Sequence, residues 1–217
     1  MYQLSIISAS AFVRTALDEL MTVEETGMLV DVDAVDLQRL ITGSIVEAVV
    51  RTHQGAPSVL VDGKEGVLGE DYTAELNDDG VITITMLQDT LRVASIQAAD
   101  SPVVLTDIVP ENSAEGRKQL NRYVRGVSDD PRVVLQKRWS EPYKPVMKYY
   151  STEEETCPEI SLEYVPYPVF DGEVILISHQ LEYAVLNELT AMILDSVKEH
   201  DKAAIYRAKS QTIMKGE

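Results

Sequence analysis

Hydrophobic positions change their spacing twice along the chain, and this divides it into three regions. Up to residue 57 and again from residue 177, apolar residues recur every three or four positions, as in helices with one buried face. Between them, short β-branched and apolar runs alternate with turn-forming residues, as in strands. We therefore expect an α+β protein, with a helical layer built from residues 1–57 and 177–217 around a β-rich region over 58–176.

Two helices are expected in the N-terminal part. The first follows Ser8 or Ser10, since either serine suits an N-cap. The second has Asp33 as its N-cap, ends before Pro57, and contains Gly43, whose cost of about 1 kcal/mol against alanine suggests close packing. Its apolar stripe consists of Leu37, Leu40, Ile41, Ile45, Ala48 and Val49.

The middle region reads mainly as strands. Val59–Val61 runs into Asp62-Gly63, a hairpin-turn dipeptide. Two further runs, 72–76 and 81–86, flank a turn at 77–80 and predict a second hairpin. The remaining predicted strands are 90–97, 132–138, 146–150 and 160–165, with one short helix over 113–124.

The C-terminal part is predicted to form two helices. Ser178 is the expected cap of the first, and Asp201 the expected start of the second. These helices should pack with the N-terminal part, because both present one apolar face.

Charge is the most unusual property of the composition. The 217 residues carry 36 acidic and 19 basic side chains, for a net charge of −17. Sequence-specific DNA binding is therefore not expected, since DNA is bound by basic surfaces. The segment from Pro110 to Tyr150 runs against this trend, with nine basic residues and five acidic ones. Such an asymmetry suits self-association of a positive patch with a negative one, although acidity also serves solubility alone.

Candidate chemistry is sparse. The chain has neither a phosphate-binding glycine loop nor histidines at metal-ligand spacing, so we expect no cofactor and no metal. His53 and His200 are explained by favourable positions near helix C-termini. The single cysteine, Cys157, excludes an intrachain disulfide and lacks a base beside it in sequence. No catalytic residue is predicted, and no apolar run is long enough for a membrane span.

One stretch carries a resemblance to a known family. Residues 109–126 read VPENSAEGRKQLNRYVRG, and a strand ending in Tyr149, Tyr150 and Ser151 follows. This pattern resembles head-to-tail adaptor, or ring, proteins of tailed phages, in particular the crAss-like group. It is also similar to tail tubular protein A and the tail accessory proteins of short-tailed phages. The matching residues are Pro110, Glu111, Ser113, Arg117, Gln119, Asn121, Tyr123, Arg125 and Gly126.

The resemblance implies a structural virion protein that is not an enzyme. Members form a twelve-fold ring beneath the portal protein, meet further tail proteins, and surround a channel through which DNA passes without sequence-specific binding. The implied location is the head–tail interface of the virion, after a period in the host cytoplasm. The candidate subunit interface comprises Arg117, Arg122, Arg125, Lys137, Arg138, Tyr149 and Tyr150.

Two other classes of function compete with this one. A non-enzymatic, soluble protein-binding module or assembly factor would have the same composition. A small hydrolase would need a polar cleft with paired acids or a metal, which only a structure reveals. The tyrosines near position 150 suit an interface or a partly exposed sheet equally well.

Overall fold

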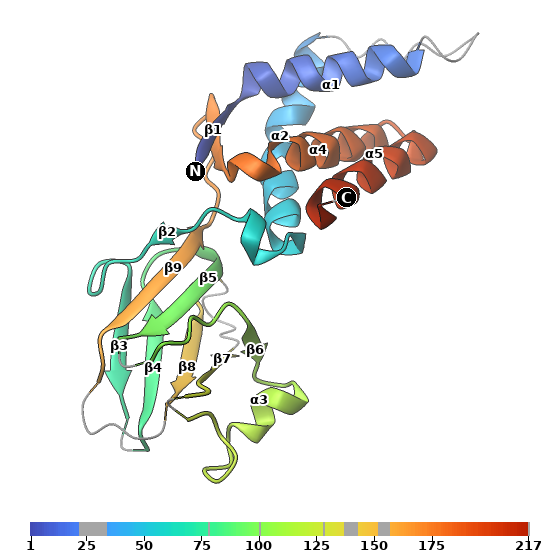
Figure 1. Ribbon diagram of the computed structural model, residues 1–217. Helices are drawn as coiled ribbons and strands as arrows, with labels where there is room; N and C mark the ends of the chain where they lie inside the picture. Colours follow the sequence, from blue (N-terminus) through green and yellow to red (C-terminus); the bar gives the residue numbers. More distant parts are fainter. Residues whose placement is uncertain are drawn as a thin grey trace. The chain divides into compact units, whose positions relative to one another are not determined.

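The fold was analysed in a computed structural model that describes residues 1–21, 34–77, 79–99, 101–127, 129–136, 143–151 and 157–216. The chain divides into two compact units (Figure 1). A helical unit comprises residues 1–62 and 168–217, and a β-rich unit comprises the continuous segment 63–167. The expected α+β class, with terminal helices and a β-rich middle, is confirmed.

Four helices form most of the helical unit. They are α1 (Ile6–Met21), α2 (Ala34–Gly55), α4 (Glu182–Ser196) and α5 (His200–Lys215). The predicted stripe of α2 is buried at Leu37, Ile41, Ile45, Ala48 and Val49, where it packs against residues of α1 and α4. Gly43 is exposed, and nothing lies within 4 Å of the position that a Cβ would occupy, so the expectation of close packing there was wrong.

A short antiparallel strand pair completes this unit. Strand β1 (Tyr2–Ser5) pairs with β10 (Val174–Ile177), and Tyr2 lies opposite Ile177. The hydroxyl of Ser5, rather than Ser8 or Ser10, accepts a hydrogen bond from the backbone N–H of Ser8 at the start of α1. Because β1 is only four residues long and runs directly into a helix, it leaves little periodic signal in the sequence.

Three other local expectations in this unit need correction. Residues 58–60 form a 3₁₀ turn rather than a strand, and Asp62-Gly63 joins no hairpin. The Ser178 hydroxyl does not cap a helix but accepts from the N–H of Asp62, while a 3₁₀ turn at His179–Leu181 precedes α4. The last helix begins at His200, one residue before Asp201. Asp33, the expected cap of α2, lies outside the described residues.

The described residues of the β-rich unit form two sheets. A five-stranded sheet has the order β3-β4-β8-β7-β6, and a three-stranded sheet has the order β2-β9-β5. Its strands are β2 (Lys64–Glu65), β3 (Tyr72–Leu76), β4 (Val81–Met86), β5 (Thr90–Ala98), β6 (Ile108–Pro110), β7 (Arg132–Gln136), β8 (Val146–Tyr150) and β9 (Ile160–Pro166). One core takes residues from both sheets, among them Ile84, Ile96 and Leu162. The predicted hairpin of β3 and β4 is confirmed, with Gly80 at φ +71° in its turn.

Three elements of this unit differ from expectation. Strands β2 and β6 were not predicted; β2 has two residues, and β6 has three residues and runs parallel to β7. The helix expected over 113–124 is only α3 (Ala114–Lys118), and the chain continues in turns to residue 125. The segment is shaped by the close approach of backbone to Gly116 and by the hydrogen bond that Gln119 accepts from Gly126, and not by an apolar stripe of a longer helix.

Candidate functional site

The segment that carries the family-like motif forms a loop beyond the edge strand β6. We call residues 111–127 the 111–127 loop; it contains α3 (Figure 1). Ser113 caps α3, since its hydroxyl accepts from the N–H of Gly116 at 3.0 Å and donates to the carbonyl of Pro110 at 2.7 Å. Gly116 is buried, and a Cβ there would overlap the carbonyl oxygen of Pro110 and lie 3.0 Å from that of Glu111.

A buried glutamine closes the other end of the loop. Gln119 is 3% exposed, and its Oε1 accepts a hydrogen bond from the N–H of Gly126 at 2.7 Å. A Cβ at Gly126 would lie 2.8 Å from the backbone N of Arg132 and 2.9 Å from the carbonyl oxygen of Tyr150. Only glycine therefore permits this close approach of the loop to the sheet.

Two arginines of the motif stabilise the loop through hydrogen bonds to backbone carbonyls. Arg117 donates to the carbonyl of Asn112, with Nη2 at 2.8 Å. Arg125 donates through Nη2 to the carbonyl of Asp79 at 2.6 Å, which ties the loop to the β3–β4 turn. These motif residues thus fix the shape of the loop, and their hydrogen-bond partners belong to the same chain.

The 111–127 loop exposes apolar and aromatic side chains to solvent. Tyr123 is 95% exposed, Leu120 is 68% exposed and Val124 is 57% exposed. Arg122 is exposed beside them. Residues 116–127 contain four basic side chains and no acidic one, in a chain with a net charge of −17. Such a combination of exposed aromatic, aliphatic and arginine side chains is typical of the centre of a protein–protein interface.

The structure distributes the predicted interface residues unevenly. Arg117, Arg122 and Arg125 all lie in the 111–127 loop, but only the side chain of Arg122 is exposed without a hydrogen-bonding role in the loop framework described above. Lys137 and Arg138 lie outside the described residues.

The two tyrosines of the predicted interface are buried within the protein. Tyr149 is 0% exposed and Tyr150 is 4% exposed. They lie on β8, between β4 and β7, and successive residues of a strand face opposite sides of the sheet. Tyr149 belongs to the main core, whereas Tyr150 packs with Val81 and Val134. Their rings are therefore not available to another subunit, which corrects the interface expectation at these two positions.

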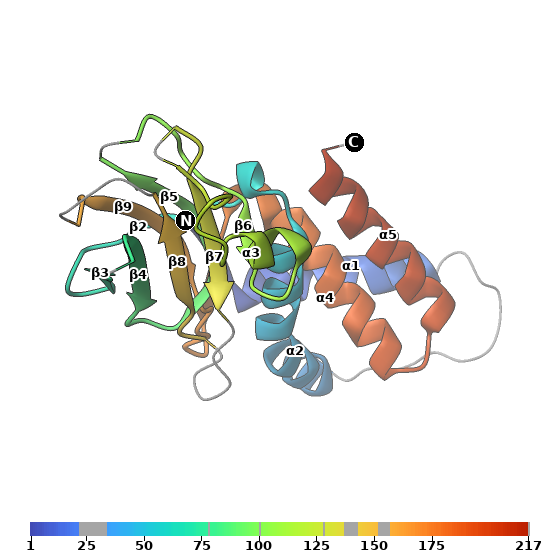
Figure 2. The same ribbon diagram turned by 90° about the horizontal axis from the view of Figure 1, so that it is seen from below.

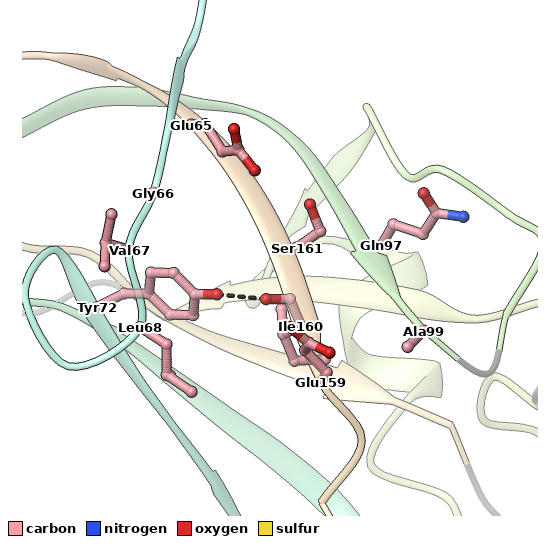
Figure 3. A pocket seen from close by; sticks show the side chains of 10 residues that line it. All are labelled: Glu65, Gly66, Val67, Leu68, Tyr72, Gln97, Ala99, Glu159, Ile160 and Ser161. Atoms are coloured by element: carbon pink, nitrogen blue, oxygen red, sulfur yellow. Dashed lines mark hydrogen bonds between the residues drawn. The ribbon is translucent and has the colours of Figure 1, made fainter.

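A cavity of about 620 Å³ lies in the β-rich unit, between residues 65–72 and the segments where β5 ends and β9 begins (Figure 3). We call it the Tyr72 pocket. The Tyr72 hydroxyl donates to the carbonyl of Ile160 in its wall, and the exposed side chains of Val67 and Leu68 line one flank. The carboxylates of Glu65 and Glu159 also line it. Burial raises the pKa of Tyr72, and the negative charges of Glu159 and Glu65 raise it further.

An ionic network around the buried carboxylate of Asp71 supports the turn beside this pocket. Asp71, 5% exposed, accepts from the N–H of Val67 at 3.0 Å and from the hydroxyl of Tyr164 at 2.8 Å. Lys64 lies 3.3 Å from the same carboxylate. The hydrogen bond from Val67, followed by those from Tyr164 and Lys64, holds the pKa of Asp71 below its usual value. These contacts hold the turn formed by residues 67–71 against β9.

The three histidines are scattered. His53, 1% exposed, lies in the last turn of α2 as expected. Its Nε2 accepts from the N–H of Ser178 at 3.1 Å, so it also connects two distant parts of the helical unit. His200 was expected near a helix C-terminus, which was wrong, because it is the first residue of α5; it contacts the carboxylate of Asp195 at 3.0 Å. His179 packs against Tyr2. Within the described residues, no three His, Cys, Asp or Glu side chains group as metal ligands would.

The sequence did not single out Leu120 and Val124, or the carboxylates of Glu65 and Glu159, as functional residues. Leu120, Tyr123 and Val124 fit the apolar face of the longer helix expected there, and such a face is normally buried. The two glutamates are far apart in sequence, and only the β2–β9 pairing brings their segments together. Among the described residues, no helix has the length and apolar character required to cross a membrane.

No protein-family model matches this chain, and no curated protein matches it either.

Proposed function

We propose that this protein is a non-enzymatic structural subunit that assembles with copies of itself into a ring, as a head-to-tail adaptor beneath the portal of a tailed phage. The observation that carries the proposal is the 111–127 loop, which exposes Leu120, Tyr123 and Val124 beside Arg122. Large apolar side chains clustered in one exposed loop favour a protein partner over a small-molecule substrate.

The fixed shape of the loop supports this proposal. Its framework is made by Ser113, Gly116, Gln119, Arg125 and Gly126, and all of these except Gly116 belong to the motif that resembles the adaptor family. A loop that is ordered before binding loses less conformational entropy in the complex. The resemblance therefore concerns residues that build a binding surface rather than residues of a reaction site.

The acidic composition fits a place around DNA. With a net charge of −17, most of the surface repels phosphate, so nucleic acid would pass such a ring without adhering to it. In this proposal the portal protein and further tail proteins are the other partners, and the protein resides at the head–tail interface of the virion.

The test is to mix the purified chain with the portal protein encoded in the same genome and to examine the sample by negative-stain electron microscopy. We expect an additional ring on one end of the portal, and portal protein alone serves as the control. A bare portal together with a monomeric chain would contradict the adaptor role. That result would favour the alternative, a soluble protein-binding module or assembly factor.

A further inference from the structure

Two surfaces of the β-rich unit, the Tyr72 pocket and the 111–127 loop, have no residue in common. The Tyr72 pocket is lined by Tyr72 of the edge strand β3, and the 111–127 loop follows the other edge strand, β6. Figures 1 and 2 both show α3 and β3 on opposite sides of this unit. The loop contacts the β3–β4 turn through Arg125, at the end of β3 away from Tyr72, and none of its residues lines the pocket of its own copy. The pocket is therefore left for an occupant from another copy.

The chemistry of the two surfaces is complementary. The loop offers the cation of Arg122 beside the phenol of Tyr123 and the aliphatic side chain of Leu120. The pocket offers the carboxylates of Glu65 and Glu159 beside Val67, which is 49% exposed, and Leu68, which is 56% exposed. Opposite charge together with apolar contact is the usual composition of a specific protein interface.

The volume and polar lining of the pocket also suit an aromatic side chain. Its volume of about 620 Å³ is in the range of cavities that enclose small organic groups. Gln97 and Ser161 lie in its lining, where they offer hydrogen-bond partners to a phenol hydroxyl (Figure 3). Tyrosine and arginine are the residues that most often dominate binding energy when they enter such pockets.

The strand register gives an independent reason for a cationic occupant. Glu65 lies directly opposite Glu163 in the antiparallel pair of β2 and β9. Like charges at opposed positions of a strand pair repel each other. Glu163 does not line the pocket, but a guanidinium placed against Glu65 would offset part of this repulsion, because it supplies a positive charge to one of the two carboxylates.

We propose that the 111–127 loop of one copy binds in the Tyr72 pocket of the next copy, with Arg122 near Glu65 and Glu159 and with Tyr123 in the cavity. This inference rests on the proposed function, and it assigns the two faces through which the copies associate. The faces differ, so the contact is heterologous, and repeated copies form a closed ring when the rotation between neighbours permits.

The experiment uses two full-length variants, each with one face blocked. The loop variant carries Arg122→Glu and Tyr123→Ala, and the pocket variant carries Glu65→Lys and Glu159→Lys. All four positions are exposed or line the pocket opening, and circular dichroism verifies that both variants fold. Each variant and their equimolar mixture are examined by sedimentation velocity over a range of concentrations.

We expect each variant alone to remain monomeric and the mixture to form a one-to-one complex that does not grow further. The intact pocket of the loop variant then receives the intact loop of the pocket variant, and no other face remains to extend the chain. Relative to the wild-type contact, each blocked face should bind at least about tenfold more weakly. A mixture that sediments as monomer, like its components, overturns the proposed contact.

Matched controls reverse a charge elsewhere. Arg39→Glu changes an exposed arginine of α2, and Glu75→Lys changes an exposed glutamate of β3 outside the pocket lining. If either control blocks the contact as strongly as the test variants, net charge rather than the two faces governs association, and the proposal is overturned.

The outcome is separable from that of the portal experiment. A one-to-one complex without a ring on the portal would support the loop–pocket contact and contradict the adaptor role. A ring on the portal together with a monomeric mixture would leave the adaptor role standing and overturn the contact.

Discussion

Glycine differs in its packing at positions 116 and 43. At Gly116 the backbone of residues 110 and 111 occupies the space that a side chain would need. At Gly43, on the exposed side of α2, nothing lies within 4 Å of the Cβ position. The sequence predicted a packing role for Gly43, whereas Gly116 has that role.

Substituting alanine at the two positions should therefore have opposite effects. Gly116→Ala should lower the free energy of unfolding by about 1–3 kcal/mol, because backbone must move to make room. Gly43→Ala should raise it by about 0.5–1 kcal/mol, because alanine favours the helix. Urea denaturation of both variants measures these changes, and a stabilising Gly116→Ala would contradict the packing described here.

Asp71 should make part of the stability depend on pH. Its hydrogen bonds with Val67, Tyr164 and Lys64 lower its pKa in the folded state below the unfolded value of about 3.9. A lowered carboxyl pKa gives stability that is fully present above the unfolded pKa and is lost as the pH falls through the folded pKa. The contribution of Asp71 should therefore be complete at pH 7 and decrease progressively below about pH 4.

Comparison with Asp71→Asn isolates this contribution from those of other carboxyls. We expect the variant to be less stable than the wild type at pH 7, with a difference that shrinks as the pH falls below about 4. Denaturation at a series of pH values measures it. A difference that stays constant over the same range would show that the charge of Asp71 does not contribute.

At the scale of elements, short pieces of structure depend on their neighbours. Strand β6 has three residues and is held by β7, and α3 has five residues and is held between Pro110 and Gln119. Isolated helices of this length are unstable in water, so the loop framework rather than helix propensity keeps α3 folded. The sequence pattern predicted a longer helix because Leu120, Tyr123 and Val124 also have helical spacing.

The role of Gln119 in the loop is directly testable. Gln119→Ala removes the acceptor of the Gly126 N–H and leaves that buried donor without its partner. We expect the Gly126 amide to exchange its hydrogen at least about tenfold faster, since about 1.4 kcal/mol corresponds to a factor of ten. Arg122→Ala, an exposed change in the same loop, is the control, and equal exchange in both variants would contradict the framework role.

At the scale of the whole molecule, the β-rich unit is inserted into the helical unit. The chain leaves the helical unit at Asp62 and enters it again at Pro168. Close to these points, the Asp62 N–H donates to the Ser178 hydroxyl at 2.9 Å, and Asp62 Oδ2 accepts from the His179 N–H at 3.0 Å. These bonds join the segments on either side of the insertion within the helical unit.

The division between the units does not follow the change in sequence pattern. The boundaries between the two units fall after residues 62 and 167, whereas the hydrophobic pattern changes after residues 57 and 176. The sequence pattern assigned residues 168–176 to the β-rich region without predicting a strand there, whereas the structure forms β10 and pairs it with β1 in the helical unit. Local pattern indicates that a segment is a strand, but it does not indicate which strand becomes its partner.

The sequence by itself determined the α+β class, the apolar stripe of α2, the β3–β4 hairpin and the strand β8, because each depends on local periodicity or turn chemistry. Only the tertiary structure decided that Tyr149 and Tyr150 are buried whereas Leu120 and Tyr123 are exposed. Burial depends on which strands flank β8 and on how Gly116 and Gln119 shape the loop. Those contacts join residues distant in the chain, and no local pattern records them.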